Sequence, residues 1–280
     1  MTGRSGADFS VLVPKLEGAL RRALRVQLTR APELAITAPR FGGAPYRESE
    51  AWPSCTACRK PFTFLGQIDA RPALAFDPGF ALATLYYCRG CSVRSSKANG
   101  HGFYVDRFAA PAPALHVPLS PKDADTFGVA RHPSCGVDLD GFRSFPHWED
   151  WDEWGLDALS SRTLGKPDDA FVRAFRAWLR PLVVTRFGSS SDASTLFSYL
   201  GGHPYWANGN VEHVAMGGVT CACGARVVQL LQLDSEDAPE FTFGKGAGLL
   251  NFFFCPGSLD PARAHAPGGV DAFRFVHQMI

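Results

Sequence analysis

Hydrophobic positions along the chain fall mostly into short runs bounded by turn residues, which is the pattern of β-strands. Four runs are rich in aromatic and β-branched residues: FTFLGQI, ALATLYYC, ARVVQLLQL and GLLNFFFC. We expect a strand at each of these places. The same pattern predicts further strands near residues 35–38, 102–108, 114–118, 183–187 and 271–278.

Helical spacing occurs in three places. Near the N-terminus, residues 14–28 predict an amphipathic helix, because Pro14 suits the first helical position and one face carries Leu16, Leu20, Ala23, Leu24 and Leu28. A short helix is expected around 147–160, and Pro167-Asp168-Asp169 opens another that ends before Pro181. Short helices between β-rich stretches favour an α+β fold.

Four sequence blocks occur twice, in the same order. They are a glycine turn (FGGAPY, then LGGHPY), a cysteine pair, a Gln-x-Asp strand (LGQID, then LLQLD), and GFALATLYYC matched without a gap by GAGLLNFFFC. Such a repeat predicts two tandem, diverged copies of a mostly antiparallel β unit with short helices, related by a pseudo-two-fold axis.

The repeat divides the chain into four parts. We expect an N-terminal amphipathic helix in 1–34 and a first β-rich repeat in 35–118. A connecting helical and acidic-aromatic segment follows in 119–195, and the second β-rich repeat occupies 196–280.

The first copy contains two CxxC turns, Cys55-Thr56-Ala57-Cys58 and Cys88-Arg89-Gly90-Cys91. A CxxC turn directs two thiolates at one point, and two such turns complete a tetrahedron around Zn²⁺. Four cysteine ligands leave no position for water, so we expect one structural zinc ion per chain. The alternative is four reduced, buried thiols.

The second copy has lost part of this pattern. Its first pair is compressed to Cys221-Ala222-Cys223, and Ser258 stands where the first copy has Cys91. The remaining cysteines could recruit a histidine such as His265, but the CxC spacing favours packed structural thiols over a metal site.

Composition limits the classes of partner. The 280 residues carry 28 Lys and Arg against 27 Asp and Glu, a net charge of +1, which gives no electrostatic footprint for nucleic acid or an anionic membrane. Neither a signal peptide nor a membrane-spanning apolar run is recognisable. The eight cysteines are therefore expected to stay in a reducing, cytoplasmic compartment, where CxxC pairs indicate metal or redox chemistry rather than structural disulfides.

Catalytic motifs are not recognisable: there is no HExxH, GxxxxGK[ST], GxSxG or GxGxxG opening a helix. Cys135, close to His132, is the one nucleophile-like candidate, and an inert cysteine is favoured there. The chain is therefore expected to be non-enzymatic, although catalysis stays an open alternative.

Candidate binding residues come from the repeated turns and from the aromatic middle segment. They either support the glycine turns or line a cleft, and they are Tyr46, Gln67, Asp69, Tyr205, Trp206, Gln232 and Asp234. In HWEDWDEWGLD, Trp151 and Trp154 lie among five carboxylates, which indicates either a packed aromatic stripe or a surface for a basic protein partner.

The motifs APRFGGAPY, FLGQID, SYLGGHPYW, LLQLDSED and GAGLLNFFF resemble the YwqG-like family of bacterial proteins, and more weakly the programmed-cell-death-type chaperones of ribosomal proteins. The resemblance covers about residues 35–280 and implies a duplicated α+β fold. It supplies no catalytic residues and does not imply the zinc site, because many members lack the cysteines. Some members lie near bacterial toxin genes.

These observations favour a non-enzymatic protein-binding protein with a structural zinc site, acting as a toxin-neutralising immunity factor or a client chaperone. The alternative is an enzyme or small-molecule binder that uses a cleft between the two repeats.

Overall fold

A computed structural model of the chain describes residues 13–30, 33–91, 95–127, 129, 134–144, 146, 198–204, 206, 220–235, 248–263, 265 and 271–279. The described strands are β1 (Arg21–Arg30), β2 (Arg40–Phe41), β3 (Thr63–Ile68), β4 (Leu82–Tyr87), β5 (Ser95–Ser96), β6 (Phe103–Phe108), β7 (Cys135–Ser144), β8 (Tyr199–Gly201), β9 (Val228–Asp234), β10 (Gly248–Phe254) and β11 (Phe273–Met279). The helices are α1 (Val13–Ala19), α2 (Pro121–Thr126) and the 3₁₀ turns η2 (Pro113–Leu115) and η7 (Pro256–Leu259).

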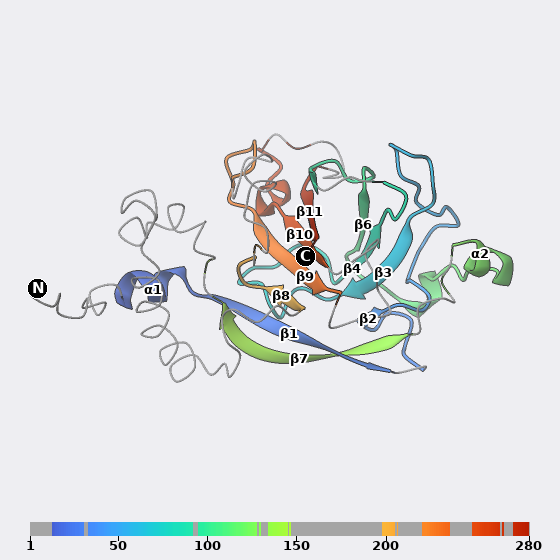
Figure 1. The fold of residues 1–280 in the computed structure, drawn as a ribbon, viewed down its shortest axis with the longest axis horizontal. Helices are drawn as coiled ribbons and strands as arrows, with labels where there is room; N and C mark the ends of the chain where they lie inside the picture. The colour runs from blue at the N-terminus through green and yellow to red at the C-terminus, as the bar shows by residue number, and fades with distance from the viewer. Residues whose placement is uncertain are drawn as a thin grey trace, which may run out of the picture.

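Within the described residues, eleven strands form one sheet in the order β5-β11-β10-β9-β8-β1-β7-β2-β3-β4-β6. The longest ladder joins β1 to β7, from Arg21 opposite Ser144 to Arg30 opposite Cys135. Figure 1 shows this pair along one side of the molecule, with β8 to β11 on one flank and β2, β3, β4 and β6 on the other. All of these pairings are antiparallel. The expectation of a mostly antiparallel β protein with few short helices is confirmed.

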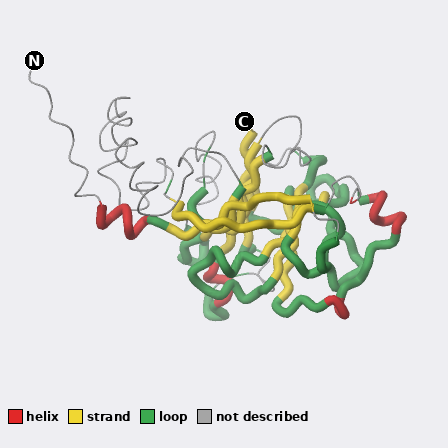
Figure 2. Tube along the Cα trace, turned by 90° about the horizontal axis from the view of Figure 1, so that it is seen from below, coloured by secondary structure: helices red, strands yellow, loops and turns green. Residues whose placement is uncertain are grey.

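The two flanks of the sheet curl toward each other. β5 pairs with β11 although it directly precedes β6 in the chain. Between the flanks the rings of Phe103 and Phe275 stack with centroids 5.5 Å apart, and the Tyr87 hydroxyl lies 3.1 Å from Nδ1 of His277. The sheet therefore approaches a closed barrel, with one core shared by both flanks. Figure 2, which views the molecule from below, shows the long β1–β7 pair crossing in front of the other strands.

The β3–β4 and β9–β10 ladders share a register. Gln67 stands opposite Thr84, and Gln232 stands opposite Asn251. Each ladder contains a bulge two residues before its glutamine, where Leu65 and Leu230 have no opposite residue. The duplication itself stays a prediction.

The structure corrects the prediction of a helix over residues 14–28. Only α1 is helical there, and from Arg21 the chain is a strand in which Leu24 and Val26 are buried. The leucines fit both a period of 3.6 and a period of two, because Leu24, Val26 and Leu28 also alternate along one strand face. Pairing with β7 on one side and β8 on the other decides the outcome.

Most other expected elements can be compared with the structure. The four core runs form β3, β4, β9 and β10, and the runs near 102–108 and 271–278 form β6 and β11. The strand expected near 35–38 is instead a turn before β2. The first two residues of the strand expected near 114–118 belong to η2. The strand near 183–187, the helix around 147–160 and the helix that opens at Pro167-Asp168-Asp169 lie outside the described residues. No helix in the described part of the chain is long and apolar enough to cross a membrane.

Candidate metal centre

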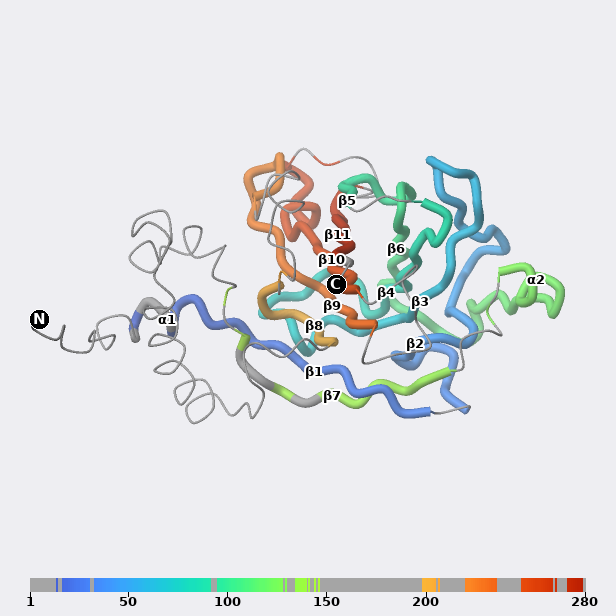
Figure 3. Tube along the Cα trace, in the orientation of Figure 1, coloured from blue at the N-terminus to red at the C-terminus, as the bar shows by residue number. Residues whose placement is uncertain are grey.

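Among the residues that the structure describes, two groups bring four ligand atoms within 4.8 Å of one another and could each hold a metal ion. One group is Cys55, Cys58, Cys88 and Cys91, and the other is Cys221, Cys223, Cys255 and His265. All eight cysteines of the chain are described, and all are free thiols. Figure 3 shows the segments leading into β3 and β9, which carry the first cysteines of each group, on opposite sides of the molecule.

The first group is built by a hairpin and a strand end. Residues 54–61 form the hairpin, in which Ser54 bridges Pro61 and the Cys55 N–H donates to the Lys60 carbonyl at 2.9 Å. At its tip the Arg59 N–H donates to the Cys55 carbonyl at 2.8 Å. Arg59 has a φ of 63°, the left-handed conformation that closes this turn. The CxxC spacing thereby directs Cys55 and Cys58 to the same side.

The second pair of this group lies at the end of β4. Cys88 is buried, and its N–H donates to the Gly102 carbonyl at 2.9 Å, so the strand ladder continues up to the ligand. Cys91 follows after a turn. The Sγ atoms of Cys55 and Cys91 are 3.4 Å apart, and so are those of Cys58 and Cys88.

These sulfur separations match a metal site better than disulfides. A disulfide joins its sulfurs at about 2.05 Å. Four sulfurs at about 2.3 Å from a tetrahedral ion lie about 3.8 Å from one another. Each of these close pairs joins one sulfur of the hairpin to one sulfur at the end of β4, so all four sulfurs surround one point.

The acidity of the thiols indicates why a cation fits this point. Burial raises the pKa of Cys55, but backbone N–H groups of Cys58 and Gly102 outweigh it, and the net pKa is lowered. Burial and the neighbouring Cys58 raise the pKa of Cys88 to about 11, and burial and Cys58 also raise that of Cys91. One thiolate is therefore tolerated, whereas four need a compensating positive charge.

Positive and aromatic side chains surround the first group. Arg59, Lys60 and Arg89 are exposed beside the cysteines. Beneath them an apolar cluster contains Phe62, Phe64 and Tyr86 together with the partly buried Trp52. The Trp52 indole N–H donates to the Phe62 carbonyl at 2.8 Å, which joins the segments on either side of the hairpin.

The sequence predicted one metal site per chain, whereas the structure contains two candidate sites. Sequence spacing favoured packed thiols for Cys221, Cys223 and Cys255, yet the structure brings His265 to them as a fourth ligand atom. His265 was a possible fourth ligand from the sequence, but it belongs to no spacing motif that would predict it as one.

The residues proposed for binding around the first glycine turn serve the fold. Gln67 is fully buried; its Oε1 accepts from the Tyr46 N–H at 2.8 Å, and its Nε2 donates to the carbonyls of Ile36 and Ala38. Tyr46 is also fully buried, and its hydroxyl donates to Glu48 at 2.6 Å. Of the two uses that the sequence left open for Gln67, support of the turn is the one observed.

The other proposed binding residues are placed as follows. Asp69 is partly exposed and pairs with Arg71 at 2.6 Å. Gln232 and Asp234 are buried in β9, and Oε1 of Gln232 lies 3.0 Å from the Tyr199 hydroxyl. Trp206 is buried against Phe253 and Val276. Tyr205, Trp151 and Trp154 lie outside the described residues.

Cys135, the nucleophile-like candidate, is buried at the start of β7. His132 lies outside the described residues.

No family model matches the chain, and no curated protein matches it. The resemblance to the YwqG-like family therefore stays a prediction, and the cysteine geometry is the principal guide to function.

Proposed function

We propose that this is a zinc-binding protein in which Cys55, Cys58, Cys88 and Cys91 hold one structural zinc ion. The observation that carries the proposal is the convergence of four free thiols, two from a hairpin and two from a strand end, within 4.8 Å. Four thiolates in a tetrahedral arrangement select zinc or iron among the common metals, and zinc is the usual occupant of an isolated site of this kind.

The proposed role of the metal is to hold the hairpin against the sheet. The hairpin is attached at its base by the Phe62 N–H, which donates to the Pro53 carbonyl at 3.0 Å, while its tip is exposed. A bound ion would join this tip to the end of β4. Since four protein ligands fill the tetrahedron, no position is left for a reacting water. The ion would thus be structural and would not itself take part in catalysis; the toxin-neutralising and client-chaperone roles stay predictions from sequence.

We also propose that the two halves of the sheet arose by duplication. Support comes from the common register and bulge of the β3–β4 and β9–β10 ladders. Further support comes from the strand order, which runs outward from the β1–β7 pair through β8, β9 and β10 on one side and β2, β3 and β4 on the other.

The metal proposal is tested by the zinc content of the purified protein and of Cys58→Ser. Cys58 is only partly buried, so its replacement changes metal binding more than packing. We expect the variant to contain one zinc equivalent per chain less than the wild type, measured by elemental analysis without added metal. The matched control is Cys135→Ser, which alters a cysteine outside both groups and should leave the zinc content unchanged. Equal zinc in Cys58→Ser and wild type, or iron in place of zinc, would contradict the proposal.

A further inference from the structure

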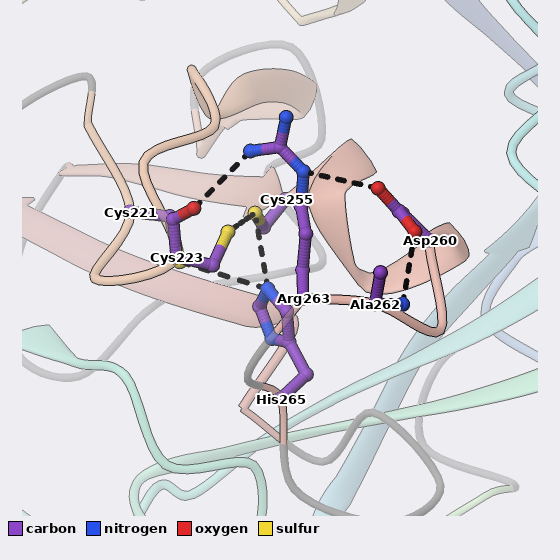
Figure 4. Close-up of polar contacts among 7 residues, drawn as sticks. All are labelled: Cys221, Cys223, Cys255, Asp260, Ala262, Arg263 and His265. Carbon is purple, nitrogen blue, oxygen red and sulfur yellow. Dashed lines mark hydrogen bonds and ion pairs between the residues drawn. The ribbon is translucent and has the colours of Figure 1, made fainter.

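Three sulfurs and one imidazole converge in the second half of the chain. Cys255 follows β10, Cys221 and Cys223 lie on the hairpin before β9, and His265 follows η7. Figure 4 shows the His265 ring directed at the sulfurs, with its Nε2 3.5 Å from Cys255 Sγ and 3.9 Å from Cys221 Sγ. Cys223 Sγ and Cys255 Sγ are 3.5 Å apart, close to the spacing in the first group.

The shortened CxC hairpin keeps the backbone of the CxxC hairpin. The Cys221 N–H donates to the Ala225 carbonyl at 2.8 Å, as the Cys55 N–H does to Lys60. At the tip the Gly224 N–H donates to the Cys221 carbonyl at 2.9 Å, and Gly224 has a φ of 81°, as Arg59 is left-handed in the first hairpin. The base is again a single bridge, between Thr220 and Arg226. The CxC hairpin, which is one residue shorter than the CxxC hairpin, therefore still directs both thiols at the same point.

The turn after Cys255 leaves space for the hairpin sulfur. A Cβ at Gly257 would lie 2.6 Å from Cys223 Sγ, so only glycine permits this approach. Gly90 occupies the corresponding place beside Cys58 in the first group, where a Cβ would lie 3.5 Å from its sulfur. Ser258, which stands where a fourth cysteine would be, donates its hydroxyl to the Cys255 carbonyl at 2.8 Å.

His265 is held in the orientation of a metal ligand. Its Nδ1 lies 3.0 Å from Asp271 Oδ1, and its side chain is only 6% exposed. A carboxylate that accepts the Nδ1 proton leaves the lone pair of Nε2 free to face the sulfurs. A carboxylate behind the imidazole is the usual outer partner of a metal-bound histidine.

The charges around the group fit a divalent cation. Three thiolates and a neutral imidazole around Zn²⁺ leave one net negative charge. The Arg263 guanidinium lies nearby, donating to the Cys223 carbonyl at 3.1 Å.

We propose that Cys221, Cys223, Cys255 and His265 bind a second zinc ion, with Asp271 as the positioning residue of the histidine. Zinc binding displaces the thiol protons and involves no oxidation or reduction. Four protein ligands again close the site, so this ion is structural. The second half of the chain has in this view kept its metal by taking a ligand from beyond the turn, in place of the cysteine that became Ser258.

Two other uses of the same side chains are distinguishable. A thiol, His265 and Asp271 could form a nucleophilic triad, but such a triad needs one thiol, whereas three sulfurs converge here within 4.8 Å of the imidazole and of one another. Cys223 and Cys255 could also form a disulfide, which would leave the histidine without a role.

The test is the zinc content and the thiol accessibility of single and double variants, measured by native mass spectrometry and alkylation. The wild type should carry two zinc ions per chain. Cys223→Ser should carry one, Cys58→Ser one, and the double variant none. In the metal-loaded wild type Cys221, Cys223 and Cys255 should resist iodoacetamide and become labelled once a chelator is added; this second measurement needs no variant to fold.

The role of the histidine has its own controls. Asp271→Asn should lower the zinc affinity of this site by about 10- to 100-fold, measured by chelator competition, while the fold is unchanged by circular dichroism. His265→Ala should release one zinc ion, and adding Ser258→Cys to it should restore two by recreating a CxxC turn.

Three results would overturn the second site without touching the first. They are a Cys223→Ser variant with the same zinc content as the wild type, rapid alkylation of these thiols in the metal-loaded protein, and a Cys223–Cys255 disulfide found by peptide mapping. Loss of zinc from Cys223→Ser but not from Cys58→Ser would instead contradict the first site alone.

Discussion

Cys58→Ser is expected to lower the free energy of unfolding by on the order of 5 kcal/mol, because metal binding and folding are coupled in small thiolate sites. Without the ion the exposed tip of the 54–61 hairpin is no longer joined to the end of β4, and the apolar cluster of Phe62, Phe64 and Tyr86 loses its cover. Urea denaturation of wild type and variant measures the loss. A chelator should lower the stability of the wild type more than that of the variant, which has only one ion left to lose.

The matched control for this loss is again Cys135→Ser, which removes a buried thiol without removing a ligand and should cost about 1 to 2 kcal/mol. A loss in Cys58→Ser no greater than this would mean that the first group contributes packing and not metal binding.

Gly202→Ala is expected to lower the free energy of unfolding by about 3 kcal/mol or more. Gly202 has a φ of 73°, and an added Cβ would lie 2.8 Å from Ser144 Cβ and 2.9 Å from Ala23 Cβ. These neighbours belong to β7 and β1, the central ladder of the sheet, so they cannot move aside cheaply. The substitution also disturbs the bond from the His203 N–H to the Ser144 hydroxyl at 2.6 Å.

The Gly79→Ala variant measures the cost of backbone strain without the crowding expected in Gly202→Ala. Gly79 has a similar φ of 75°, but its Cβ would meet only the flexible end of Leu259, at 3.0 Å. It should cost about 1 to 2 kcal/mol, the penalty of the left-handed conformation alone. Equal losses from the two substitutions in thermal or urea unfolding would show that the turn is not packed against the β1–β7 pair.

The first metal group was predictable because each of its two cysteine pairs lies within four consecutive residues of the sequence. A CxxC turn places two thiols together whatever the rest of the fold does, so two such turns need only be brought close. The strands β3, β4, β9 and β10 were predictable for a similar reason, since runs such as GLLNFFFC are apolar on both faces and bounded by turns.

The remaining features depend on long-range contacts. Leu24, Val26 and Leu28 satisfy both a helix and a strand, and only the pairing of β1 with β7 and β8 decides between them. The fourth ligand of the second group, His265, belongs to no spacing motif, and its partner Asp271 is oriented only after β10 and β11 pair. Gln67 looked available for binding because a sequence does not reveal that the Tyr46 N–H and two carbonyls occupy its amide.

Zinc K-edge X-ray absorption of the protein, purified without added metal, tests the central claim most directly. Four cysteines in one group and three cysteines with one histidine in the other give seven sulfur ligands and one nitrogen for two ions. The account therefore predicts a shell dominated by sulfur at about 2.3 Å, with a minor nitrogen component at about 2.0 Å that disappears in His265→Ala. A shell dominated by nitrogen or oxygen would contradict it, because the zinc would then be bound at neither cysteine group.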